Sequence, residues 1–137
     1  MPTPVAKTGN QSIDGLIWGW KWDTTDLTVS FPQDTSVYQD YKGIQTFTPF
    51  TQTQINQIVS FGLNNLGVFT NLKFTPDNSG FGNLRFAQAE AIDYGPPHYN
   101  GVPHIPGGRG SAEANPPDPH LVQPFAQGDN WFTLGKY

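Results

Sequence analysis

Residues 51–69 read TQTQINQIVSFGLNNLGVF, and this stretch predicts the one long helix of the chain. Thr51 and Gln54 fit a capping box, in which the hydroxyl accepts a backbone N–H and the glutamine side chain returns to the cap. Phe50 and Ile55 fit the two positions of a hydrophobic staple. Apolar residues then recur at helical spacing on one face: Ile55, Ile58, Val59, Leu63, Leu66 and Phe69. We therefore expect an amphipathic helix that packs this face on a sheet.

Short strand patterns lie on both sides of the expected helix. Leu27–Phe31 alternates apolar and polar residues before it, and residues 33–49 then form a polar loop. Three further strand patterns follow the helix: Leu72–Thr75, Leu84–Ala87 and one within Gly128–Leu134, where a turn comes first. A strand–helix–strand order favours a parallel crossover. We expect an α+β fold, with one long helix packed on a small, twisted, mixed β-sheet.

The composition changes after Gly95. Eight of the 13 prolines lie between positions 96 and 124, together with several glycines. This excludes a regular helix in the segment, and any strand there must be short and at a sheet edge. We therefore predict a long Pro/Gly-rich loop near the C-terminus. Residues 1–11 are expected to be a flexible N-terminal segment, and residues 12–137 to be a single structural unit.

Composition and charge exclude several classes of protein. The 137 residues include no cysteine, which excludes a disulfide framework, a thiolate zinc site and a cysteine nucleophile. A net charge of −4 with seven Lys and Arg argues against nucleic-acid binding. No apolar run approaches the roughly 20 residues that span a bilayer, and no signal peptide is recognisable at the start. We expect neither a nucleic acid nor a membrane as a partner.

Three histidines and few carboxylates are available for chemistry. His98, His104 and His120 all lie in the Pro/Gly-rich segment, and imidazole is a common zinc ligand. Their spacing matches no compact metal site, so we favour three exposed loop histidines over a metal-binding loop. Glu90 and Glu113 are the only glutamates, and nothing in the sequence selects a general acid–base pair.

Trp18, Trp20 and Trp22 occur at a spacing of two residues. In an extended chain this spacing places all three rings on one face. The rings could form a platform for sugars or bases, or they could cover the protein interior. We favour the second interpretation, because bulky aromatic side chains usually bury their area.

Five stretches, in order along the chain, resemble the catalytic domain of serralysin-type zinc metalloproteases. They are Ile13–Pro32, Thr70–Thr75, Asn83–Gln88, Val102–Gly108 and Gly128–Phe132. The first is similar to the family's IDxLLxGxKW and LTYSFP motifs, and the next two to its xNLxFTE and ADIRFAxS motifs. The last two are similar to AYAYxPG and GDVWFN. The resemblance is collinear over about residues 12–134.

The resemblance implies the N-terminal part of a metzincin-like catalytic domain, with a long helix and a twisted sheet of about five strands. It also implies an edge strand that pairs with extended peptide substrate, here Gly101, Val102, Pro103, His104 and Ile105. Pro103 departs from the family pattern and lacks the N–H that such pairing uses.

The zinc motif of the family, His-Glu-x-x-His-x-x-Gly-x-x-His, does not occur in this sequence. The resemblance therefore implies a parent protease in which a complementary C-terminal segment supplies the zinc ligands and the glutamate base, and in which calcium also binds. This chain alone is expected to supply the scaffold and the substrate-binding edge without hydrolysing peptides. Secretion without an N-terminal signal peptide is also implied. The alternative is a non-catalytic module, or pseudoenzyme, that binds a peptide or a glycan.

Two further expectations follow from the resemblance. The chain could stop short of the zinc motif at an expression boundary, at a proteolytic nick or through a split gene. Apolar side chains that face the complementary segment in the parent protein should then be exposed in the chain alone.

Overall fold

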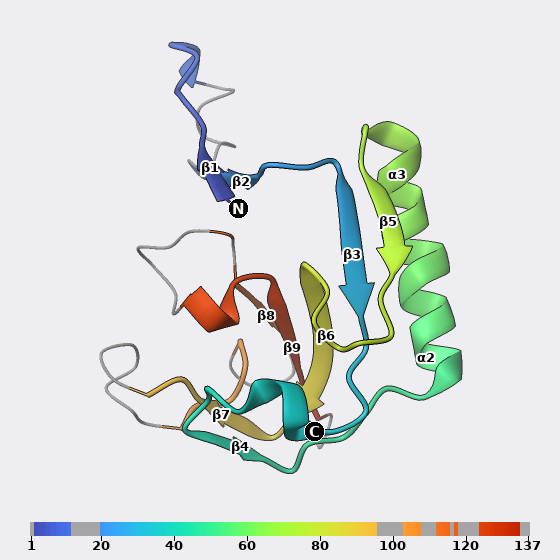
Figure 1. Cartoon of the computed structure of the whole chain (residues 1–137), viewed down its shortest axis with the longest axis vertical. Coiled ribbons are helices and arrows are strands. Elements are labelled where there is room, and N and C mark those ends of the chain that lie inside the picture. The colour runs from blue at the N-terminus through green and yellow to red at the C-terminus, as the bar shows by residue number, and fades with distance from the viewer. Residues whose placement is uncertain are drawn as a thin grey trace.

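The computed structural model of the chain describes residues 2–11, 20–95, 103–107, 112–115, 117 and 124–134. Its centre is a five-stranded sheet (Figure 1), with the strands in the order β5 (Lys73–Pro76), β3 (Asp26–Ser30), β6 (Leu84–Ala89), β9 (Asp129–Thr133) and β8 (Ala112–Ala114). The first four strands run parallel to their neighbours, and β8 runs antiparallel to β9. The expected mixed sheet of an α+β fold is therefore confirmed.

One helix crosses the sheet between its first two strands in the chain. It consists of three continuous six-residue segments: α2 (Gln52–Gln57), the π-helical η2 (Ile58–Leu63) and α3 (Asn64–Phe69). The predicted capping box is present, with the Gln54 N–H 3.3 Å from Thr51 Oγ1 and the Thr51 N–H donating to Gln54 Oε1 at 2.9 Å. Since β3 and β5 are parallel neighbours, the predicted crossover is confirmed as well.

The apolar stripe of the helix is buried only along part of its length. Leu63 is buried and Ile55 and Val59 are half-buried, but Leu66 is 52% exposed and Phe69 is 87% exposed. The prediction of one continuous buried face is wrong for α3. In η2 the Asn64 N–H donates to the carbonyl of Val59, five residues back, which is the wider winding of a π-helix. This winding shifts the spacing of the stripe, so that the last turns carry their apolar residues away from the sheet.

Two small antiparallel ladders flank the central sheet. β1 (Pro2–Pro4) pairs with β2 (Trp20–Trp22), and β4 (Gly43–Gln45) pairs with β7 (Ala91–Asp93). The segment 1–11, expected to be flexible, thus contributes a strand. The expected polar loop 33–49 contains β4 and a short 3-10 helix, η1 (Thr35–Tyr38), whose N-cap is Asp34.

The two faces of the sheet carry two aromatic clusters. On one face the buried rings of Tyr38, Tyr41, Tyr94 and Trp131 pack together with Ala87 and Ala89 of β6. On the other face, Phe86 lies between Phe31 and Phe132, with ring centroids 5.4 and 6.3 Å away. This division follows the alternating burial of β6, in which every second side chain belongs to the first cluster.

The Pro/Gly-rich segment is described in part. Its strand, β8, has three residues and lies at the edge of the sheet, as the sequence predicts. A three-residue 3-10 helix, η4 (Pro124–Ala126), precedes β9. Among the described residues, no helix has the length and apolar character that crossing a membrane requires.

Candidate functional site

The outer edge of β8 is the first feature of the molecule that could bind a partner. The antiparallel ladder aligns Glu113 with Trp131 and Ala114 with Asn130. Next to them, the Asn115 N–H donates to the Asp129 carbonyl at 2.9 Å. Hydrogen-bonded and non-bonded pairs alternate in such a ladder, so Glu113 is the next bonded residue. The backbone N–H and C=O groups of Ala112 and Ala114 therefore point away from β9, and no described strand pairs with them.

The predicted edge residues lie elsewhere. Gly101 and Val102 are outside the described residues. Pro103 and Ile105 are exposed, and between them His104 exchanges two backbone hydrogen bonds of 2.9 Å with Ile92 of β7. The edge of the five-stranded sheet belongs to β8 instead. The sequence does not reveal β8, because the three residues Ala112–Ala114 are too few to establish an alternation of apolar and polar residues. A short strand at the sheet edge is nevertheless the kind of strand that the sequence predicts for this segment.

A polar cluster holds β8 to the segment before it. The Glu113 carboxylate accepts the Tyr94 hydroxyl at 2.6 Å and the Gly107 N–H at 3.3 Å, and its oxygens lie 3.0 and 3.2 Å from His104 Nε2. The Asn115 side chain donates to the Tyr94 hydroxyl at 2.7 Å. Glu113 thus ties residues 103–107 to the edge strand. Its neighbours Ala112 and Ala114 are exposed on the opposite face.

This cluster also bears on the three histidines, which the sequence favours as exposed loop residues over metal ligands. His104 is instead half-buried and pairs with a carboxylate, so the prediction of exposure is wrong at this position, while His98 and His120 lie outside the described residues. Within the described ranges, no three His, Cys, Asp or Glu side chains are grouped as a metal would require.

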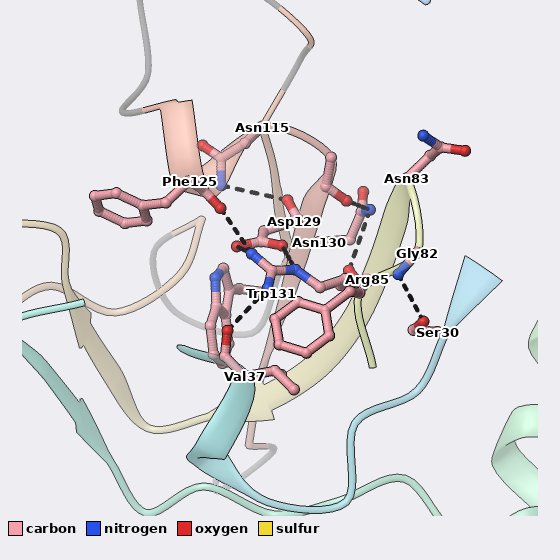
Figure 2. Close-up of polar contacts among 12 residues, drawn as sticks. Ser30, Val37, Gly82, Asn83, Arg85, Asn115, Phe125, Asp129, Asn130 and Trp131 are labelled. Atoms are coloured by element: carbon pink, nitrogen blue, oxygen red, sulfur yellow. Dashed lines mark hydrogen bonds and ion pairs between the residues drawn. The ribbon is translucent and has the colours of Figure 1, made fainter. Parts of the chain in front are cut away.

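A buried ion pair holds β9, the neighbour of β8 in the sheet, against β6 (Figure 2). Arg85 of β6 holds the carboxylate of Asp129 of β9 with two N–H groups: Nε lies 2.5 Å from Oδ1, and Nη2 lies 2.9 Å from Oδ2. The same guanidinium donates to the carbonyls of Val37 and Phe125, at 3.0 and 2.7 Å. One side chain therefore joins β6, β9, η1 and η4.

Aromatic hydroxyl and indole groups complete this network. The Tyr41 hydroxyl donates to Asp129 Oδ2 at 2.5 Å and accepts the Trp131 Nε1–H at 3.0 Å. The Arg85 guanidinium also lies 4.8 Å from the centre of the Tyr38 ring. The sequence shows the motifs around Arg85 and Asp129 but not their pairing, since two residues 44 positions apart leave no local pattern.

Burial and ion pairing have opposite effects on the pKa values of Asp129 and Arg85. Burial raises the pKa of Asp129 to about 6, although the charge of Arg85 and the hydrogen bonds from Arg85 and Tyr41 act to lower it. Burial acts to lower the pKa of Arg85, but the charge of Asp129, its hydrogen bonds with Arg85 and the nearby Tyr38 and Tyr41 together raise that pKa. Burial raises the pKa of Tyr41 well above its ordinary value, with a further contribution from Asp129, which keeps the phenol a donor.

Gly128 allows β9 to start beside β6. Its φ is +81°, and a Cβ at this position would lie 1.8 Å from the Asn83 carbonyl oxygen. The same Cβ would lie 3.1 Å from the ring of Trp22. Trp22 is half-buried. Trp18 and the side chain of Trp20 lie outside the described residues.

Neither the protein-family models nor the curated protein sequences match this chain.

Proposed function

We propose that the chain is the N-terminal portion of the catalytic domain of a secreted, serralysin-like zinc metalloendopeptidase. In this role it supplies the sheet scaffold and the edge strand that binds substrate. The five collinear motifs support this proposal, together with a sheet of five strands and one long helix. The observation that carries it is the outward-facing backbone of β8 at the edge of that sheet.

An extended peptide would pair with β8 as an added strand. The N–H and C=O groups of Ala112 and Ala114 would exchange hydrogen bonds with the peptide backbone. The small side chains of Ala112 and Ala114 leave room for such a strand. We therefore assign the pairing role to β8 in place of residues 101–105, where His104 already pairs with β7.

The chemistry would come from the complementary C-terminal segment of the parent protein. A zinc ion on the three histidines of that segment would polarise the scissile carbonyl, and its glutamate would take a proton from the attacking water. The present chain would position the peptide and would not hydrolyse it alone. Calcium binding and export without an N-terminal signal peptide belong to the same proposal.

Edge pairing can be tested in this chain by a proline substitution. Because the Ala114 N–H points away from β9, Ala114→Pro removes a donor that β8 does not use for its own ladder. An extended peptide titrated into the labelled protein should shift the amide signals of β8 in wild type and in the control Ala114→Ser, but not in Ala114→Pro. Equal shifts in all three proteins would contradict edge pairing.

The protease assignment needs a separate measurement. Casein should be cleaved in a zinc-dependent way by the parent polypeptide and not by the 137-residue chain. Zinc-dependent cleavage by the chain alone would contradict the division of roles.

A non-catalytic peptide-binding module is the second candidate, and the same β8 edge favours it. The two candidates differ in the polypeptide that accompanies the chain in its natural source. A co-purifying or continuous segment with the zinc motif supports the protease, whereas a stable monomer that binds peptide without zinc supports the module.

A further inference from the structure

A groove lies at the far side of the sheet from β8. It has a volume of ≈ 720 Å³, within the range of about 300–1,000 Å³ that is usual for small-molecule sites. It is bounded by α2 and η2, by the carboxyl ends of β3 and β5, by η1, and by the turn after β5. Because β8 and β5 are the two opposite edges of the sheet, this groove is separate from the proposed peptide site.

The floor of the groove is apolar. Six side chains form it: Val29, Phe31, Ile55, Val59, Leu63 and Phe74. Phe31, Ile55, Val59 and Phe74 are only half-buried, so apolar surface remains open to a ligand. A ligand that covers this apolar surface removes it from water, which is favourable.

The rim of the groove carries charge of one sign only. Asp34 and Asp77 are the charged residues among those that line it, and no Lys, Arg or His lines it within the part of the chain that the structure describes. Each carboxylate accepts the N–H of the residue two positions on, Ser36 and Ser79, at 2.8 Å. Hydrogen bonds from these serines lower the pKa of both carboxylates, so both are ionised at neutral pH.

We propose that this groove binds a small organic cation, with an aromatic or branched aliphatic body on the apolar floor and an ammonium or guanidinium group near the carboxylates of Asp34 and Asp77. The apolar body of such a ligand would cover the open apolar surface of the floor. Its positive charge would be attracted by the two carboxylates of the rim, where no cation is found among the described residues. A neutral ligand would gain the apolar contact but not the attraction between charges, and the carboxylates would repel an anion.

The probe is 2-phenylethylamine, with 2-phenylethanol as its neutral analogue. In amide NMR titrations at low salt, the amine should bind with a Kd on the order of millimolar. It should shift the signals of residues such as Val59 and Phe74, and it should bind several-fold more tightly than the alcohol. Each of the two solvent-accessible carboxylates should account for about two- to fivefold of that difference.

Two variants separate charge from cavity. The double variant Asp34→Asn and Asp77→Asn keeps side chains that can cap both turns, and it should bind amine and alcohol equally well. The control Asp40→Asn removes an exposed charge that does not line the groove, and it should retain the preference for the amine. Ser60→Phe fills the groove from an exposed helix position and should abolish binding of the amine.

The outcomes decide the proposal in either direction. Equal affinity of wild type for amine and alcohol would overturn the charge argument. Shifts that do not saturate, or that lie away from the groove, would overturn the site itself. Unchanged binding by Ser60→Phe would do the same.

Discussion

Removal of the Asp129 carboxylate tests whether the buried ion pair organises the sheet. In Asp129→Ala, the Arg85 guanidinium would keep its position, with a side chain only 10% exposed, but would lose both contacts to the carboxylate. The Tyr41 hydroxyl would lose its acceptor as well. Breaking a buried pair by removing one partner typically costs about 3–5 kcal/mol, because the remaining charge is left buried and uncompensated. A domain of this size has roughly 5–15 kcal/mol of unfolding free energy, so the loss should be large.

Urea denaturation followed by tryptophan fluorescence measures this loss. Lys73→Ala is the matched control, because its ion pair with Asp26 is 3.6 Å long, has side chains 75% and 52% exposed, and should change stability by at most about 1 kcal/mol. The double variant Arg85→Met and Asp129→Leu should be more stable than the sum of its single variants predicts. A cost of Asp129→Ala no larger than that of Lys73→Ala, or single-variant effects that simply add in the double variant, would contradict the organising role of the ion pair.

Three further predictions concern pH, a glycine and the helix cap. The pKa of Asp129 is raised in the folded state to about 6 from an ordinary value of 3.8, so its contribution favours folding at low pH and is lost as the pH rises through 6. From pH 5 to pH 7 the unfolding free energy of wild type should therefore fall by about 1 kcal/mol relative to that of Asp129→Asn, and a constant or opposite difference would contradict this assignment. Gly128→Ala should cost on the order of 3 kcal/mol or more in urea denaturation, because its Cβ would overlap the Asn83 carbonyl at a φ of +81°. The control Gly62→Ala, which meets nothing within 4 Å in the helix, should stabilise by about 1 kcal/mol, and similar effects at both glycines would be the opposing result. Thr51→Ala should lower stability by about 1 kcal/mol through loss of the cap, with Thr51→Ser close to wild type; an equal loss in both would point to another cause.

The features that the sequence predicts well are those with local causes. The cap at Thr51 depends on residues three positions apart, and the strand at Leu27 depends on alternation within five residues. Both appear in the structure where expected. The parallel pairing of β3 with β5 follows from a general rule of chain connection, which requires no knowledge of side-chain contacts.

The features that the sequence does not reveal depend on contacts between distant residues. β8 has no pattern of its own, and it becomes a strand because β9 lies beside it. The Arg85–Asp129 pair forms only once two strands are parallel neighbours. The exposure of Leu66 and Phe69 depends on the π-helical winding of η2, whereas the periodicity argument assumes regular α-helical winding throughout. Phe61 and Val68, 77% and 75% exposed on the same helix, show how much apolar surface this leaves open.

The central claim, that β8 is the substrate edge of a zinc protease, is tested most directly by the kcat/KM of the parent polypeptide for an extended peptide, with and without Ala114→Pro. We expect zinc-dependent cleavage with a kcat/KM that falls about tenfold in the variant, since the lost hydrogen bond is one that the substrate uses. Zinc content and folding stability should stay close to those of wild type. Cleavage that does not require zinc, or an unchanged kcat/KM in a variant with a proline at the edge, would contradict this claim.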